Sequence, residues 1–428
     1  MSNETALKVG VTRSKTGYVI VLLVLGLLAL AGFFTYFYVL NKDPGPEAWG
    51  LFTVNFVFLL GVSQFGVVFS AIMRVCKARW PKPFYRLAET ATVAFFPFAI
   101  VAFLFIYFYG RHDLLYWLSY TSDDHHNAWL NADWLLYRNL FAQLFFYAIA
   151  FIYFFMALAP DIDDDMVQSG PGWRRALYRM LLFFKSDEDR EVTDGKLYNM
   201  SVVVMIAFVL PNTFIAWDFG MMLFPHYHST VYPMYFIMGN LFAGSAALVL
   251  LHVLLSRYTE EGVHFGVRQI QNMGVLLTGF ALLWLYFHWA QFFVTWFGNL
   301  PHEYGPLWKQ MYGHYAPFFW IMLICVVGIP IAFLIFQKIK RTLWTMQLVT
   351  IIMVVGIWIN RYLAIMPALV DDHVVFNSFL EAVITFGWFA SYFFVLLLLF
   401  SVFPMISRWE MVSSSGDRPT EYVTYTFK

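Results

Sequence analysis

The stretch WGLFTVNFVFLLGVSQFGVVFSAIMRV, residues 49–75, decides the fold class of this chain. It contains no carboxylate, and its one cation, Arg74, stands next to its end. About 20 consecutive apolar residues are long enough to cross the hydrocarbon core of a bilayer as an α-helix. We therefore predict that this stretch is a membrane-spanning helix.

Nine further apolar runs of similar length follow or precede it. The first of them is too long for a secretory signal and lacks a small-residue cleavage site, so we expect it to remain as a helix. The longest connection, 160–198, is charged and is expected to be a solvated loop. The fold class is therefore all-α, a polytopic membrane protein with ten transmembrane helices. The expected spans are 18–40, 51–74, 88–109, 135–159, 199–219, 231–256, 274–297, 317–337, 344–364 and 380–403.

The composition supports this class and excludes several others. Of the 428 residues, 60% are hydrophobic and only 13% are charged, whereas a soluble domain has about 25% charged residues. The net charge of zero excludes a basic nucleic-acid-binding protein. The two cysteines, Cys76 and Cys325, exclude a disulfide scaffold and an iron–sulfur cluster held within this chain.

The cations predict the orientation. Most lysines and arginines fall on one side of the expected spans, including the N-terminal segment, the connections 75–87 and 160–198, and the C-terminal tail 404–428. By the positive-inside rule this side is cytoplasmic, so both termini are expected inside. The localisation that follows is the bacterial inner membrane.

The opposite, outer side is rich in histidine and carboxylate. Histidine exchanges protons near neutral pH, which suits a redox reaction coupled to protons. An aromatic belt with polar loops is the alternative interpretation. The outer histidines are His112, His125, His126, His226, His228, His302, His314 and His373.

Polar groups inside the spans are functional candidates because they are costly in hydrocarbon, although each alone is more often an interhelical partner. Most lie toward the outer half, and Asn212, Asn240 and His252 lie deeper or nearer the cytoplasm. Candidates toward the membrane ends and interior are Gln64, Glu89, Arg138, Asp218, His288, Gln291, Arg361 and Glu381.

Resident cofactors are not expected in this chain. Two haems would need paired histidines at matching depth, and only His288 lies near mid-membrane. We predict no metal site, while the pairs His125/His126 and His226/His228 leave one open as an alternative. No phosphate-binding loop, nucleophile elbow or zinc-binding motif is present.

Several segments resemble a known family. The succession 49–75, KARWPKPFYRLAETATV (77–93) and YGRHDLLYWLSY (109–120) resembles the polysulfide reductase/NrfD-like membrane subunits that interact with quinone. Four later stretches are similar to one branch, the membrane subunits of alternative complex III (the second copy) or of the periplasm-facing menaquinone reductase complex. They are WLNADWLLYRNL (129–140), AWDFGMMLFPHYHSTVY (216–232), LLWLYFHWAQFFVTWFGNLPHE (282–303) and WINRYLAIMP (358–367).

The resemblance implies two four-helix bundles, 51–219 and 231–364, flanked by the peripheral helices 18–40 and 380–403. It implies a subunit of a quinone oxidoreductase complex, not active alone, with menaquinone as substrate and no haem or iron–sulfur cluster of its own. Implied partners are a peripheral iron–sulfur subunit on the periplasmic face, a multihaem cytochrome c, a molybdopterin-type subunit and a second NrfD-like subunit, in addition to lipid. No nucleic-acid partner is expected.

The chain departs from the family pattern at the positions whose side chains would accept the protons of a quinol. Gln64 and Phe108 stand where members with a recognised quinol site carry histidines, and Arg138 stands where they carry an aspartate. We therefore expect other residues to handle the quinone. The candidates are His112, Asp113 and Asp218 as proton exchangers, and Gln64, Phe108, Arg111, Asp133 and Arg138 as the quinone-binding residues.

Two alternatives remain open. In the first, the chain is a scaffold and proton conduit without its own quinone site. Its expected proton-path residues are Glu89, Asn212, His252, His288 and Glu381. The second is a secondary transporter, which the sequence favours less because no pair of Gly/Pro-broken helices occurs at matching positions in the two halves.

Overall fold

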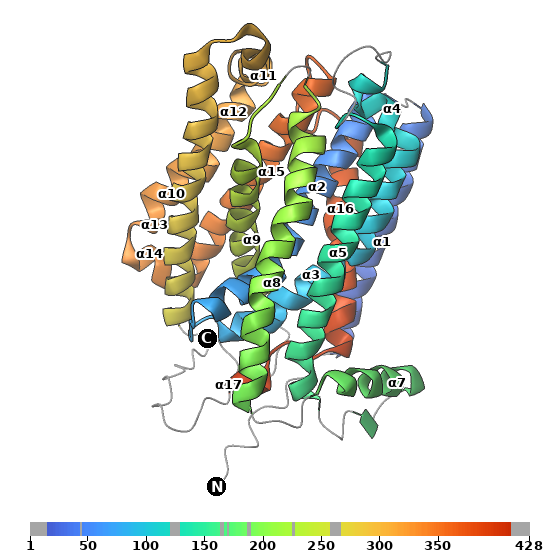
Figure 1. Cartoon of the computed structure of the whole chain (residues 1–428), viewed down its shortest axis with the longest axis vertical. Coiled ribbons are helices and arrows are strands. Elements are labelled where there is room, and N and C mark those ends of the chain that lie inside the picture. Colours follow the sequence, from blue (N-terminus) through green and yellow to red (C-terminus); the bar gives the residue numbers. More distant parts are fainter. Residues whose placement is uncertain are drawn as a thin grey trace.

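The fold is a bundle of long helices. The computed structural model describes residues 15–42, 45–119, 129–162, 167–168, 171–185, 190–224, 227–256 and 267–411, and it contains no β-strand within these ranges. Ten helical segments in them are long and apolar enough to cross a membrane, and they run side by side (Figure 1). The expected all-α membrane fold is confirmed.

The helices follow the expected order along the chain. Nine of the ten spanning segments consist of or begin with α1 (Lys15–Lys42), α2 (Pro46–Val75), α3 (Lys82–Phe105), α5 (Ala132–Leu158), α8 (Arg190–Ala216), α9 (Tyr232–Ser256), α10 (Val267–Gly298), α15 (Leu343–Leu369) and α16 (Phe379–Val402). The remaining span is built from α12 (Ala316–Leu323), a π-helical segment Ile324–Gly328 and α13 (Ile329–Leu334). Shorter helices are α4 (Arg111–Leu114), α7 (Gly172–Leu181), α11 (Pro301–Tyr312), α14 (Gln337–Arg341) and α17 (Arg408–Met411).

Two helices begin well before the expected spans. We expected starts at residues 199 and 274, whereas α8 begins at Arg190 and α10 at Val267. An apolar run marks only the part of a helix that lies in hydrocarbon, and a helix can continue into the polar interfacial layer. Hydropathy therefore locates a span better than it locates the ends of its helix.

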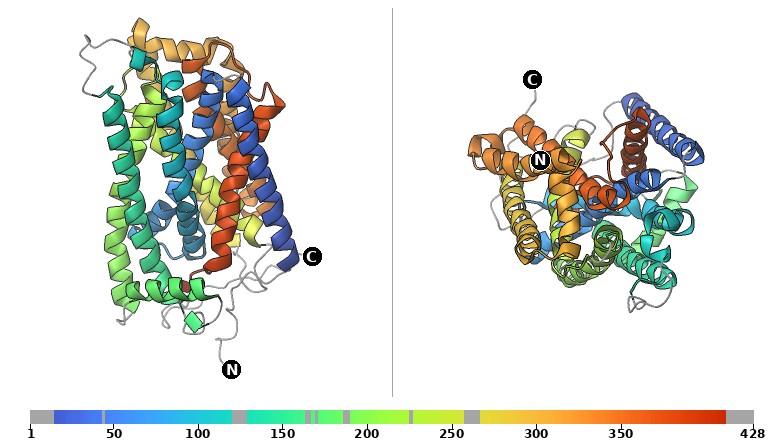
Figure 2. Two further views of the ribbon diagram at one scale, coloured as in Figure 1. Left: turned by 90° about the vertical axis from the view of Figure 1, so that its right-hand side faces the viewer. Right: turned by 90° about the horizontal axis from the view of Figure 1, so that it is seen from above.

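Helix α2 lies at the centre of the molecule. In its most apolar window 89% of the residues are buried, against 11% for α1. It packs against α3, α8, α9 and α15. Helices α1 and α16 pack against each other at the periphery (Figure 2). This packing is consistent with two groups of four helices flanked by a peripheral pair.

We call the end at which α2 begins and α15 ends the outer end, and the opposite one the inner end, following the predicted orientation. Helix α7 lies across the inner end (Figure 1). Its Tyr178 and Leu181 are buried in a cluster with Phe154 and Phe403. The expectation of a solvated loop was therefore wrong for 172–181, because this amphipathic segment covers apolar side chains of α5 and of the segment after α16.

Two spanning helices change to π-helical geometry at their outer ends. Helix α3 continues as Ile106–Gly110 before α4, and α8 continues as Trp217–Met221. Single π-helical turns inside α-helices are rare and are frequent at functional sites, because they turn side chains away from the regular helical face. The second of these segments carries Asp218, one of the predicted site residues.

Candidate functional site

A buried ion pair joins α5 to the outer end of α8. Arg138 Nε lies 2.9 Å from Asp218 Oδ2, and Arg138 Nη2 lies 2.5 Å from Asp218 Oδ1. Asn139 Nδ2 donates a further hydrogen bond to Oδ2 at 2.6 Å, and Trp129 Nε1 donates one to Oδ1 at 3.1 Å. Both charged side chains are almost completely buried. Two opposite charges can remain in such a place because the bidentate geometry and the added donors satisfy them.

The ion pair holds an aromatic wall in place. The Arg138 guanidinium lies 4.2 Å from the centre of the Trp129 ring and donates to the Trp129 carbonyl at 2.6 Å. The Trp129 ring in turn packs edge-on against Trp217 at 5.1 Å. The two tryptophans therefore stand in a fixed position at the outer end of α8.

The tryptophans form one wall of an open groove of about 560 Å³, whose volume lies in the range of small-molecule sites. Its other lining residues come from the end of α8, the connection between α8 and α9, the outer part of α10 and the first turn of α11. Apolar side chains predominate, with an imidazole, an amide and a carboxylate among them. The lining residues are Trp129, Trp217, Met221, Met222, His228, Ser229, Thr230, Val231, Ala290, Gln291, Val294, Thr295 and Glu303.

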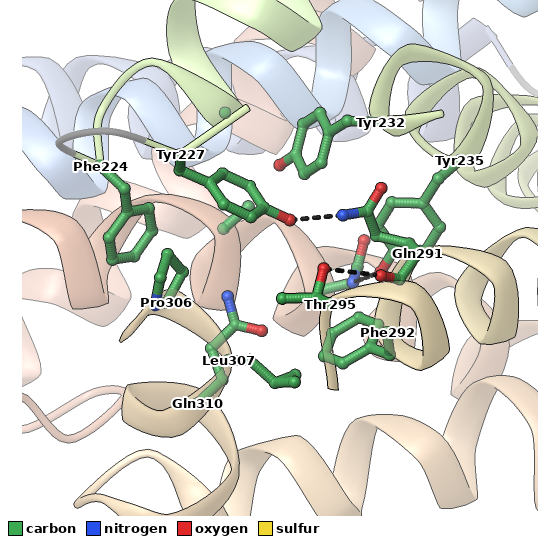
Figure 3. Close-up of a pocket in the computed structure, with 13 residues that line it drawn as sticks. Phe224, Tyr227, Tyr232, Tyr235, Gln291, Phe292, Thr295, Pro306, Leu307 and Gln310 are labelled. Atoms are coloured by element: carbon green, nitrogen blue, oxygen red, sulfur yellow. Dashed lines mark hydrogen bonds between the residues drawn. The ribbon is translucent and has the colours of Figure 1, made fainter. Parts of the chain in front are cut away.

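Gln291 also lines a second, smaller cavity of about 30 Å³ (Figure 3). Gln291 donates a hydrogen bond to Tyr227 Oη at 2.6 Å and accepts one from Ser229 Oγ at 2.5 Å. Tyr232 and Tyr235 also line this cavity. Burial, aided by the neighbouring tyrosines, raises the pKa of Tyr227 well above its usual range, so its hydroxyl keeps its proton. Gln291 and Thr295 line both spaces, which makes the amide accessible from each.

A chain of buried polar side chains starts in the first group of helices. Gln64 on α2 donates to Gln143 on α5 at 2.6 Å and accepts from Asn212 on α8 at 2.8 Å. Asn212 then accepts from Asn240 on α9 at 2.8 Å. Gly61 leaves room for this contact, because a Cβ there would lie 2.2 Å from Asn240 Oδ1. Four helices are thus joined by amides alone.

The chain continues through the second group of helices. Arg361 on α15 donates to Asn240 Oδ1 at 2.9 Å and to Asn360 Oδ1 at 3.3 Å. Asn360 donates to Tyr235 Oη, which lies 3.4 Å from His288 Nδ1. Arg361 is buried, and no carboxylate contacts it among the described residues. Its positive charge therefore stays largely uncompensated next to the smaller cavity, which Asn360 lines.

The predicted quinone-binding residues and proton exchangers do not all meet. Arg138 and Asp218 form the ion pair, whereas Gln64 belongs to the buried polar chain. Phe108 is 62% exposed, and Arg111 lies with its guanidinium 4.9 Å from the Tyr107 ring centre. The three remaining residues are each exposed at the outer end: His112 and Asp113 on α4, and Asp133 in the first turn of α5.

The predicted proton-path residues fall in four places. Asn212 and His288 belong to the buried polar chain. Glu89 lies at the inner end, 3.3 Å from Arg86 and 3.6 Å from Arg74, and the His252 ring packs edge-on against Phe84 at 5.7 Å. Glu381 lies at the outer end, 3.6 Å from His373. The candidate metal ligands His125, His126 and His226 lie outside the described residues.

Sequence reasoning missed Gln143 and the tyrosines around Gln291. A signal for Gln143 was available, since it follows Asn139 by four residues and so lies on the same helical face as this partner of Asp218. For Tyr227 and Tyr235 there was no such signal, because tyrosines are common at membrane interfaces. Only the packing of α9 and of the α8–α9 connection against α10 brings them to Gln291.

The model of the polysulphide reductase NrfD family matches residues 39–371, which include the groove, the ion pair and the buried polar chain. The chain belongs to the NrfD family. NrfD-family proteins are membrane subunits of quinone-interacting reductase complexes, in which they partner other redox subunits. A comparison with individually curated proteins found no match.

Proposed function

We propose that this NrfD subunit exchanges electrons and protons with the quinone pool in the groove between the outer ends of α8 and α10. The observation that carries the proposal is the combination of two fixed tryptophans with a buried amide in an open groove of about 560 Å³. A flat ring is held by aromatic side chains, and a few polar groups give it its orientation. The substrate we propose is menaquinone, on the family resemblance.

Each polar residue of the groove has a proposed role. The Gln291 amide hydrogen-bonds one ring oxygen, and His228 and Glu303 take up or return the protons that accompany the electrons. Arg138 and Asp218 position Trp129 rather than exchange protons, because every oxygen of Asp218 already accepts two hydrogen bonds. The exposed His112, Asp113 and Asp133 pass protons to the outer aqueous phase.

The electron partners we propose are redox subunits at the outer end, on the periplasmic face of a bacterial inner membrane. They are a peripheral iron–sulfur subunit with a multihaem cytochrome c and a molybdopterin-type subunit beyond it. A second NrfD-like subunit belongs to the same proposal where the complex is of the alternative complex III kind. The groove lies at the outer end, so a ring bound there is close to such a subunit.

A photoreactive azido-quinone tests the position of the site in membranes that contain the assembled complex. We expect cross-links to peptides of the α8–α9 connection and of the outer part of α10, and competition by unmodified quinone. Cross-links confined to α3 and α5, or to another subunit of the complex, contradict the proposal.

The buried polar chain supports a second candidate function, proton conduction without a quinone site in this chain. It joins Gln143 to His288 through both groups of helices and passes Asn212 and Arg361. Amides and phenols in one continuous line are able to relay protons together with intervening water. The number of protons moved per electron, measured in proteoliposomes, tests this candidate. If the chain conducts protons without binding quinone, Asn212→Leu lowers that number and leaves the affinity of the complex for quinone unchanged.

A further inference from the structure

Three side chains with ligand atoms meet at the outer end, on segments that do not line the groove. Glu47 lies in the first turn of α2, His373 in the connection after α15 and Glu381 in the first turn of α16. His373 Nε2 lies 2.8 Å from Glu47 Oε1 and 3.6 Å from Glu381 Oε1. One ligand atom from each of the three lies within 4.8 Å of the other two.

Tyr362 determines which ring nitrogen of His373 carries the proton. The Tyr362 hydroxyl donates to the His373 carbonyl at 3.1 Å, and its oxygen lies 2.6 Å from His373 Nδ1. A hydroxyl has one proton to donate, so Nδ1–H is the donor in the second contact. The neutral ring then has its lone pair on Nε2, and this lone pair faces the carboxylates.

A lone pair that faces two carboxylates calls for a positive ion between them, either a proton on Nε2 or a metal ion. The His373 and Glu381 side chains are only 2% and 14% exposed, so water does not screen them effectively. His373 Nε2 and Glu381 Oε2 are buried and have no hydrogen-bond partner among the described residues. The contact of Nε2 with Glu47 Oε1 at 2.8 Å therefore marks the place of that positive ion.

We propose that Glu47, His373 and Glu381 bind a divalent transition-metal ion of the Zn²⁺ type. Ligands about 2.0 Å from a tetrahedral zinc lie about 3.3 Å apart, which the two measured separations bracket. A metal-bound histidine commonly donates its other N–H to a fixed acceptor, as His373 does to Tyr362. Glu47, whose side chain is 51% exposed, leaves the fourth position to water.

The ion joins three segments: the beginning of α2 in the centre of the molecule, the connection after α15 and the beginning of the peripheral α16. His373 and Glu381 lie beyond the region that the family model matches, and none of the three proposed ligands lines the proposed quinone groove.

The test uses the purified full-length chain, stripped by a chelator and titrated with Zn²⁺ against a chromophoric chelator. We expect one equivalent to bind, and the thermal unfolding midpoint to rise with it. Glu381→Gln and His373→Gln weaken binding at least tenfold, and Tyr362→Phe weakens it about 10–100-fold while all three ligands stay in place. Asp372→Asn is the matched control, because this carboxylate is exposed and adjacent to His373 in the sequence but is not a proposed ligand. We expect this variant to bind Zn²⁺ as tightly as the native chain.

Two results overturn the proposal. The first is that the native chain binds Zn²⁺ no more tightly than His373→Gln does. The group would then be only a protonated His373 between two carboxylates. The other is a loss in Asp372→Asn equal to that in the ligand variants. If a ligand variant does not fold, Co²⁺ titration of the native chain decides. A tetrahedral site gives strong visible absorption bands, and their absence contradicts the assignment.

Discussion

At the scale of single residues, the polar side chains of the outer half are held by many partners. Asp218 accepts four hydrogen bonds, and the amide of Gln291 is oriented by Tyr227 and Ser229. In hydrocarbon an unpaired polar group is costly, so satisfied groups such as these are rigid. Arg361 is different because neutral acceptors alone surround it among the described residues.

The first prediction concerns the ion pair of Arg138 and Asp218. Arg138→Gln leaves a buried carboxylate without its cation, and we expect it to lower the free energy of unfolding by about 3–5 kcal/mol. Chemical denaturation in mixed micelles measures this. Lys309→Gln is the control: it breaks the pair with the exposed Asp371 at 2.8 Å, which water screens, so its effect on stability should be small. Equal losses in the two variants contradict the buried pair.

The second prediction concerns Gly61, the glycine that contacts Asn240 in the buried polar chain. Gly61→Ala places a methyl group 2.2 Å from Asn240 Oδ1, so Asn240 must move away from Asn212 and Arg361. We expect destabilisation by about 1–3 kcal/mol, seen in the same denaturation experiment. Gly279→Ala on α10 has no atom within 4 Å of its new methyl group and should be neutral or stabilising. A neutral Gly61→Ala would show that the contact is absent.

At the scale of helices, close packing depends on small residues where backbones approach. A Cβ on Gly32 of α1 would lie 2.5 Å from the Gly387 Cα of α16, and the reverse holds for Gly387. The hydroxyl of Tyr18 also donates to the Leu397 carbonyl of α16. Without a hydrophobic driving force in lipid, such backbone contact is what associates two helices.

The third prediction separates this pair of helices. Gly387→Leu cannot be accommodated at the crossing, so α1 should detach and its amide hydrogens should exchange faster. Hydrogen–deuterium exchange measures this in detergent. Gly26→Ala on α1 is the control, because its methyl group would meet only the Phe394 ring at an ordinary 3.4 Å. Unchanged protection of α1 in Gly387→Leu contradicts the close packing.

At the scale of the whole molecule, the charge asymmetry predicts the orientation. Cations gather at the inner end, where Arg74 and Arg86 also form a buried cluster with Glu89, Asp161 and Glu410. This cluster ties the segment after α16 to α2 and α3. The outer end carries the groove, the exposed carboxylates and the group around His373.

The fourth prediction tests this orientation with the two native cysteines. Cys76 is exposed at the inner end, whereas Cys325 lies inside a spanning segment. A membrane-impermeant maleimide should label Cys76 in inverted vesicles and not in intact spheroplasts, and Cys76→Ser should abolish the labelling. Labelling from the outside would reverse the assignment of the two ends.

The sequence was sufficient for the number and order of the spans, because each is a long apolar run. It was insufficient for α7, whose amphipathic pattern lies within a charged connection, and for the π-helical ends of α3 and α8, which have no sequence signal of their own. Of the predicted site, Arg138 and Asp218 do meet. The grouping of Gln291 with Tyr227 and Trp129 depends on how α9 packs against both α8 and α10, which a single sequence does not determine.

The most direct test of the central claim is quinol turnover by the assembled complex carrying Gln291→Leu. This change keeps the size of the side chain and removes its hydrogen bonds, so we expect the KM for quinone to rise about tenfold, as for the loss of about 1–1.5 kcal/mol of binding energy. Gln337→Leu, at an exposed position at the inner end, should leave the KM unchanged. An unchanged KM in Gln291→Leu, in a complex that assembles normally, would contradict the groove as the quinone site.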